Sequence, residues 1–203
     1  FTGLYKPPVK IPPEASAVHH ITNKMVADKP SFKDSGDLSR IKKLFEDGGS
    51  IIVAHNAPFD LAMIKKEGIE PKKFICTLRL ARHLDPEEKI DRYNLQYLRY
   101  FLDLEVEAMA HDAMGDVLVL EKLFEYLKMK MMQENNSQKT VFWEPKRPSF
   151  GNLENGNQDE EVIEKMMEIS SHPSLLRAFK FGKYNGKKIE DVMRIDRGYL
   201  QWL

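Results

Sequence analysis

The sequence predicts an α/β protein in which amphipathic helices alternate with short, partly parallel strands. Apolar residues recur at helical spacing in segments that are separated by two short apolar runs, at residues 50–54 and 74–77. The run Ile51-Ile52-Val53-Ala54 is uninterrupted and largely β-branched, which is typical of a strand buried on both faces, as in a parallel sheet. Hydrophobic residues make up 42% of the chain and aromatic residues 10%, so the composition supports a folded core.

The first fifty residues combine extended chain with short helical segments. Residues 4–13 carry four prolines and predict an extended connector, preceded by the end of a strand at residues 1–5. A short helical turn is expected within residues 11–20. The apolar spacing over residues 38–46 predicts a helix, which Gly48-Gly49 ends.

A strand, a tight turn and a helix are expected next, over residues 50–67. Pro58 suits the first turn of a helix, Asn56 is a possible N-cap, and Gly68 ends the helix. The remaining elements of this part of the chain are, in order, a strand at 74–77 and helices at 78–84, 94–102 and 112–131.

Composition divides the chain into a larger N-terminal domain, residues 1–132, and a smaller C-terminal module, residues 159–203. Residues 133–158 between them are rich in Asn, Gln, Ser, Pro and Gly, which is typical of a linker. Within the module, Asn185-Gly186 lies between short strand-like runs and predicts a β-hairpin.

Charge and cysteine content narrow the class of protein. The 31 basic and 31 acidic residues cancel, but residues 154–168 sum to −5 and residues 169–203 to +4. Because local charge attracts phosphates, the neutral total does not exclude a nucleic-acid partner. The single Cys excludes an internal disulfide, and no apolar run approaches the ~18 residues of a membrane helix. We therefore expect a cytoplasmic protein that does not enter a membrane.

The first candidate constellation is His55-Asn56-x-x-Phe59-Asp60, where the strand at 50–54 gives way to a helix. In open α/β sheets, ligands bind at the carboxyl ends of the strands, which would place Asp60 at a binding edge. Taken alone, an acid in the first turn of a helix is more often explained by the helix dipole. This motif therefore needs support from elsewhere in the chain.

The second constellation is His111-x-x-x-x-Asp116, at the start of the helix expected over 112–131. At ~100° per residue, Asp116 lies about 60° from the middle of an apolar stripe formed by Ala113, Val117, Leu120, Phe124 and Leu127. A half-buried carboxylate needs a cation, hydrogen-bond donors or a metal. The alternative, of equal weight here, is that Asp116 pairs with a Lys while His111 is a surface residue.

Together, the two constellations resemble the DEDDh superfamily of 3′–5′ exonucleases, which includes proofreading exonucleases. The segment His19-His20-Ile21-Thr22 is similar to the family's His-Gly-Ile-Thr, and residues 74–82 are similar to its strand–helix segment before the last motif. The resemblance covers residues 4–128. It implies an RNase H-like mixed sheet flanked by helices.

The C-terminal module has its own resemblance. The segments Phe181-Gly182-Lys183-Tyr184-x-Gly186 and Gly198-Tyr199-Leu200-x-Trp202 look like the small C-terminal module of exonuclease X-like proteins. Its aromatic residues could stack on bases, with nearby Lys residues on the backbone. A small core of Phe181, Tyr184, Tyr199 and Trp202 under a solvated Lys rim is the favoured interpretation.

The resemblance implies a metal-dependent 3′–5′ exonuclease that hydrolyses phosphodiester bonds at the 3′ end of DNA, preferably single-stranded, in replication or repair. Two Mg²⁺ or Mn²⁺ ions would serve as cofactors. It implies that Asp116 binds the ion that activates the attacking water, that Asp60 supports the second ion, and that His111 is the general base. It further implies a terminal-nucleotide pocket lined by His19, His55, Asn56 and Phe59.

Two alternatives stay open. An RNA-trimming 3′–5′ exoribonuclease would use the same chemistry, because 2′-OH contacts decide between the substrates. A catalytically inactive nucleic-acid-binding or polymerase-associated subunit is the other. The sequence does not indicate an oligomeric state.

One family feature has no counterpart in the sequence. The family carries an Asp-x-Glu pair on its first strand, and no such pair precedes His19; Asp103-Leu104-Glu105 matches only by chance, at a helix end. We therefore expect that the chain is a fragment that lacks the N-terminal strands. By itself it is expected to be inactive and poorly folded, with an exposed apolar sheet edge.

Overall fold

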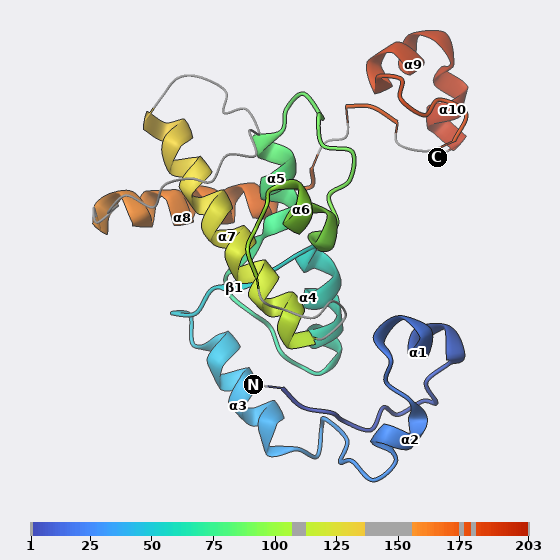
Figure 1. The fold of residues 1–203 in the computed structure, drawn as a ribbon, viewed down its shortest axis with the longest axis vertical. Helices are drawn as coiled ribbons and strands as arrows, with labels where there is room; N and C mark the ends of the chain where they lie inside the picture. The colour runs from blue at the N-terminus through green and yellow to red at the C-terminus, as the bar shows by residue number, and fades with distance from the viewer. Residues whose placement is uncertain (1, 107–112, 137–155, 175–176, 180–181, 203) are drawn as a thin grey trace.

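The computed structural model describes residues 2–106, 113–136, 156–174, 177–179 and 182–202 (Figure 1). Three helices precede the first strand: α1 (Pro13–His19), α2 (Asn23–Val26) and α3 (Gly36–Glu46). The central part contains β1 (Ile52–Ala54), α4 (Ala57–Lys66), β2 (Phe74–Cys76), α5 (Thr77–Leu84), α6 (Leu95–Phe101) and α7 (Ala113–Asn136). The last helices are α8 (Gly156–Ser171), α9 (Ile189–Ile195) and α10 (Arg197–Trp202).

The two strands form a parallel pair, as the sequence predicts for this part of the chain. Ile52 is opposite Phe74 and Ala54 is opposite Cys76, so both strands end at the same edge of the sheet. Ala54 is buried, but Ile52 and Val53 are only half-buried rather than buried on both faces. Among the described residues β1 pairs with β2 alone, which leaves its other edge without a strand.

The main core lies where α5, α6, α7 and α8 meet β2. Helix α5 buries Leu80, Ala81 and Leu84, and α6 adds Leu98 at the same centre. These positions recur every three or four residues, which is the spacing that brings them to one face of a helix. The core therefore fixes the direction in which α5 leaves the sheet edge.

Helix α7 buries the C-terminal end of the predicted stripe, at Leu127, together with residues of a neighbouring row. Val119, Leu123 and Leu127 are fully buried, whereas Val117 is 55% exposed. Two neighbouring rows of α7 are apolar, so periodicity alone does not select between them. The contacts of α7 with α5, α6 and α8 decide which row is buried.

Helix α8 packs with the main core, although the predicted division assigns residues 159–171 to the C-terminal module. Val162 and Met166 are buried in the main core, and the Ser170 hydroxyl accepts a hydrogen bond from the Cys76 backbone N–H at 2.8 Å. An apolar face at helical spacing is buried wherever it finds a matching surface, and here that surface is β2, α5 and α7. This packing favours a boundary after Ser171.

The C-terminal module has a separate small core of Phe179, Tyr184 and Val192. Gly186 has a φ of +82°, and an antiparallel bridge between Ala178 and Lys188 flanks the turn, as a hairpin requires. Tyr199 packs against this core. Trp202, in contrast, is 78% exposed and is not part of the predicted mini-core. Phe181 lies outside the described residues.

The N-terminal segment differs from its prediction at one point. Residues 2–5 form no strand, and the Tyr5 hydroxyl instead donates a hydrogen bond to Asp37 of α3 at 2.9 Å. The predicted helical turn is confirmed as α1. In Figure 1, α1 and α2 lie to one side of the helices that form the main core. A helix that is both long and apolar enough to cross a membrane is absent from the described residues.

Candidate active site

A sharp corner joins β1 to α4 at the carboxyl edge of the sheet. Asn56 occupies the N-cap position of α4, but its side chain makes no capping hydrogen bond. Its backbone is left-handed, with φ 67° and ψ 45°, a conformation that Asn tolerates better than most residues. The next turn of chain presents Phe59, whose ring is 65% exposed. The corner therefore carries a polar and an aromatic side chain at its surface.

Asp60 lies in the first turn of α4, as the sequence predicts. The residue is exposed, but partial burial of its carboxyl group raises the pKa, and a hydrogen bond from its own backbone N–H opposes this shift. Asp60 forms no ion pair within the described part of the chain. Its charge is therefore not neutralised by a basic side chain there.

His55 is directed into the protein at the same corner. Its Nε2 lies 2.6 Å from the carbonyl oxygen of Tyr93, and its Nδ1 lies 2.9 Å from the hydroxyl of Thr77. Because a carbonyl only accepts, Nε2 carries the proton, and the Thr77 hydroxyl lies within hydrogen-bond distance of both Nδ1 and, at 3.3 Å, the Ala54 carbonyl oxygen. Burial lowers the pKa of His55, with Arg82 adding to the shift and the bond to Tyr93 opposing it. A neutral His55 thus links the end of β1 to Thr77 at the start of α5 and to Tyr93 in the chain before α6.

Asp116 lies half-buried near the start of α7, with a neutral partner rather than the Lys of the alternative interpretation. The Gln96 amide on α6 donates a hydrogen bond of 2.7 Å to its Oδ1. The other amide atom, Gln96 Oε1, is buried and has no hydrogen-bond partner. Two oxygen-bearing groups are therefore adjacent, one charged and one with an unsatisfied acceptor.

Sequence reasoning did not identify Gln96. A signal was present, because Gln96 is an uncharged polar residue in the otherwise mostly apolar and aromatic helix Leu-Gln-Tyr-Leu-Arg-Tyr-Phe. Such a residue often makes a specific buried contact. Its partner is 20 positions away in the sequence, so only the packing of α6 on α7 identifies it.

No hydrogen bond or ion pair of the described residues joins Asp116 to the corner between β1 and α4, and none brings the two remaining predicted site residues there. His111 lies outside the described residues. His19 is exposed at the end of α1, and its Nδ1 accepts a hydrogen bond of 3.0 Å from the nearby Ile21 backbone N–H.

The donor groups fit a hard divalent cation, although they do not complete a site. Carboxylate and amide oxygens are the ligands that Mg²⁺ and Mn²⁺ prefer. The unsatisfied Gln96 Oε1 beside Asp116 is the observation that favours a cation here. Within the described residues, however, no group of three or more His, Cys, Asp or Glu side chains could bind a metal ion.

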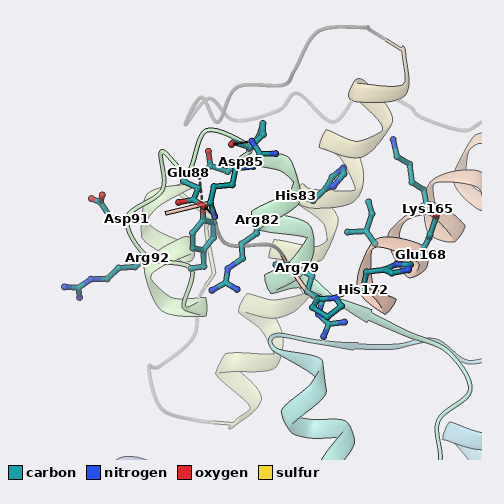
Figure 2. A pocket seen from close by; sticks show the side chains of 16 residues that line it. Arg79, Arg82, His83, Asp85, Glu88, Asp91, Arg92, Lys165, Glu168 and His172 are labelled. Atoms are coloured by element: carbon teal, nitrogen blue, oxygen red, sulfur yellow. Dashed lines mark hydrogen bonds between the residues drawn. The ribbon is translucent and has the colours of Figure 1, made fainter. Parts of the chain in front are cut away.

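A pocket of about 670 Å³ lies along α5 and does not include Asp60 or Asp116 (Figure 2). Arg79 and Arg82 line it from α5, Tyr93 from the chain before α6, and His172 and Arg177 from the chain after α8. Sequence analysis did not predict this pocket, because its walls come from segments that are far apart in the chain.

The alternation of helices with a parallel pair of strands defines a protein of the α/β class. Residues 1–124 match the family model described as Exonuclease, and residues 179–203 match the Exodeoxyribonuclease X-like C-terminal model. The chain belongs to the exonuclease family. The second match begins after α8 and coincides with the small separate core.

Individual relatives agree with this assignment. The chain is 33% identical to exodeoxyribonuclease 10 of Escherichia coli K12, over 98% of this chain and 74% of that protein. It is 36% identical to the DNA polymerase III subunit epsilon of Treponema pallidum, over 61% of this chain and 58% of that protein.

A solved structure, exonuclease X in complex with 5′ overhanging duplex DNA, superimposes with a TM-score of 0.51 at 27% identity. It covers 83% of this chain and 79% of that one. The predicted resemblance and the predicted fold class are confirmed.

Proposed function

We propose that this protein is a metal-dependent 3′–5′ exonuclease that hydrolyses phosphodiester bonds at the 3′ end of DNA. One observation carries the proposal: Asp60 and Asp116 lack basic partners among the described residues, in a chain of the exonuclease family. A surface acid commonly lies close to a basic side chain. An acid that binds a metal ion must instead keep its carboxylate free to contact the ion.

Each site residue has a distinct role in this proposal. Asp60 and Asp116 bind divalent ions, and the Gln96 amide holds the Asp116 carboxylate in one orientation. Bound Mg²⁺ or Mn²⁺ supplies Lewis-acid stabilisation of the charge on the phosphate. His111 accepts a proton from the attacking water, because imidazole has an ordinary pKa of ~6.5, near working pH.

The corner between β1 and α4 receives the terminal nucleotide. The exposed ring of Phe59 offers a stacking surface, and the Asn56 side chain, which makes no capping bond, offers hydrogen bonds. His55 serves this pocket by holding the corner in place, since both of its ring nitrogens are engaged within the protein. His19 remains a further candidate for contact with the nucleotide.

A direct cleavage assay on the natural protein that contains this sequence tests the proposal. The substrates are 3′-labelled single-stranded DNA, DNA with a 5′ overhang and RNA of the same sequence, each with Mg²⁺, with Mn²⁺ and with EDTA. We expect release of labelled mononucleotide from DNA, faster from single strands, and none in EDTA. Faster cleavage of RNA would replace the DNA assignment. Metal-independent cleavage would overturn the site.

The same assay on residues 1–203 alone addresses the incomplete ligand set. Because the sequence has no Asp-x-Glu pair before His19, we expect no magnesium-dependent cleavage from these residues by themselves. Robust cleavage would contradict this expectation. The cytoplasmic location and a role in DNA replication or repair belong to the same proposal. One relative is named as a DNA polymerase III subunit.

A further inference from the structure

The pocket along α5 contains arginine side chains whose direct partners are neutral groups. Arg79 donates to the Ser170 carbonyl oxygen, Arg177 donates to the Pro86 carbonyl oxygen, and the Arg82 guanidinium lies 5.4 Å from the centre of the Tyr93 ring. All three partners are neutral. In the part of the chain that the structure describes, none of these guanidinium groups forms an ion pair.

Several acids also line the pocket, and two of them accept hydrogen bonds from backbone N–H groups. The buried Asp85 carboxylate accepts hydrogen bonds from the Lys89 and Ile90 backbone N–H groups and from the Tyr93 hydroxyl. Glu88 accepts a bond of 2.7 Å from the Arg177 backbone N–H. In Figure 2, Asp91 points away from the pocket. Glu168 is exposed at the rim and is the acid most able to compete with an anion.

Arg82 is the most informative of the three. Its Nε is buried and has no hydrogen-bond partner, so one donor of a charged group is unsatisfied. An unsatisfied buried donor costs free energy unless a ligand accepts its bond. Arg79 and Arg82 are three positions apart on one helix, and Figure 2 shows both on the side of α5 that borders the pocket.

The pocket shares a wall with the candidate active site. The backbone carbonyl of Tyr93 accepts the proton of His55 at the end of β1, while the Tyr93 ring lies under Arg82. Helix α5 also begins directly after β2, whose last residue is opposite the last residue of β1. A strand whose 3′ end reaches the corner at Asn56 can therefore continue toward α5.

We propose that this pocket binds phosphates of the nucleic-acid backbone, upstream of the nucleotide that is removed. The inference rests on the proposed function and adds a second contact region to it. Guanidinium groups match phosphate oxygens in geometry and charge, and each such contact releases counterions. The competing interpretation is that the arginines only hold the chain after α8 against α5.

Binding in EDTA, where cleavage is blocked, tests the proposal on the natural protein. We measure the anisotropy of a labelled single-stranded oligonucleotide between ~50 and ~200 mM salt. Arg82→Gln should weaken binding about threefold at low salt and lower the salt slope by about 0.7, while Arg82→Lys should recover part of the slope. Arg194→Gln, an exposed arginine on α9, is the matched control. An Arg82→Gln variant that binds with the wild-type slope would overturn the proposal.

Two further measurements distinguish the loss of a phosphate contact from misfolding of the variant. Glu168→Gln removes the competing charge and should tighten binding, which a damaged fold would not do. In the unaltered protein, arginine-specific modification followed by mass spectrometry should show that the oligonucleotide protects Arg82 and not Arg194. Equal modification of Arg82 with and without the oligonucleotide contradicts the proposal. Protection by inorganic phosphate alone, and not by the oligonucleotide, would reassign the pocket to a free anion.

The outcomes separate this inference from the proposed function. If the wild-type protein binds through Arg82 but cleaves nothing, the pocket stands and the exonuclease assignment fails. If it cleaves DNA but Arg82→Gln binds with unchanged affinity and salt slope, the exonuclease assignment stands and the pocket fails.

Discussion

Two regions of this molecule carry side chains of opposite charge that form no ion pairs among the described residues. The acidic edge, formed by Asp60 and Asp116 with Gln96, has carboxylates that meet no basic side chain in the described residues. The arginine pocket, formed by Arg79, Arg82 and Arg177, has guanidinium groups whose direct partners in the described part of the chain are carbonyl oxygens and a ring. His55 and Tyr93 lie between the two.

The contrast indicates that one nucleic-acid strand contacts the protein in two different ways. At the acidic edge, direct approach of a phosphate is repulsive, so a cation must mediate the contact. In the arginine pocket the contact is direct and depends on salt. Chemistry is therefore expected at the first region and affinity at the second. The following predictions test that division, from the largest effect to the smallest.

Asp116→Ala in the natural protein should reduce cleavage about 10⁴-fold, because a lost metal ligand removes several kcal/mol of transition-state stabilisation. Affinity for the oligonucleotide in EDTA should stay near wild type. Glu121→Ala, an exposed acid on the same helix, serves as the control in the labelled-DNA assay. A near-wild-type cleavage rate for Asp116→Ala would remove α7 from the site.

His111→Ala should reduce the cleavage rate about 10³-fold, the usual contribution of a general base. The variant should also lose the acidic limb of the pH–rate profile, since that limb reports protonation of the base. Rates measured across pH check both points. A retained acidic limb would assign the base to another group.

Gln96→Ala should reduce cleavage by about 10- to 100-fold, the range observed when a group that orients a ligand is removed. The loss should appear as a weaker apparent affinity for Mg²⁺, which a titration of rate against metal concentration measures. Gln96→Glu tests the orientation directly, because it places a second negative charge beside Asp116. An unchanged Mg²⁺ dependence in both variants would make Gln96 purely structural.

Met166→Ala should lower the free energy of unfolding by about 2–5 kcal/mol, since this fully buried residue lies in the main core. The matched control is Met193→Ala on α9, where the side chain is 54% exposed and little change is expected. Chemical denaturation measures both. If Met193→Ala is the more damaging substitution, α8 does not contribute the far wall of the arginine pocket.

His55 links the two regions and should make stability depend on pH. Burial lowers its pKa in the folded state, so protonation favours the unfolded chain. Its contribution is fully present above the unfolded pKa of ~6.5 and is lost as pH falls from there toward the folded pKa. Denaturation between about pH 5 and pH 8 should show a smaller slope for His55→Gln than for wild type.

Local patterns were sufficient for most elements of the fold. The apolar run before His55 predicts β1. Pro58 marks the first turn of α4, Gly68 follows its end, and β2 leads directly to α5. These features depend on residues close together in the chain. The motifs around Asp60 and Asp116 were likewise readable from spacing. Both acids lie at the starts of their helices as expected.

Three features required the tertiary structure. The buried face of α7 depends on its neighbours, since two of its rows are equally apolar. The position of α8 depends on a surface that β2 and α5 form. Ser170 of α8 contacts Cys76 of β2, which lies 94 positions earlier in the sequence. The partner of Asp116 is likewise known only once α6 packs on α7.

The sequence by itself thus determined the class of fold, the order of the elements and the identity of the acids. The fold class and the order of the elements follow from periodicity and turn chemistry within one segment, whereas the acids were proposed from the resemblance to an exonuclease family. Only the tertiary structure decided that the acids have no basic partners among the described residues, and that arginines from α5 and from the chain after α8 line one pocket. Charge compensation depends on distances between segments, and these distances exist only in the folded chain.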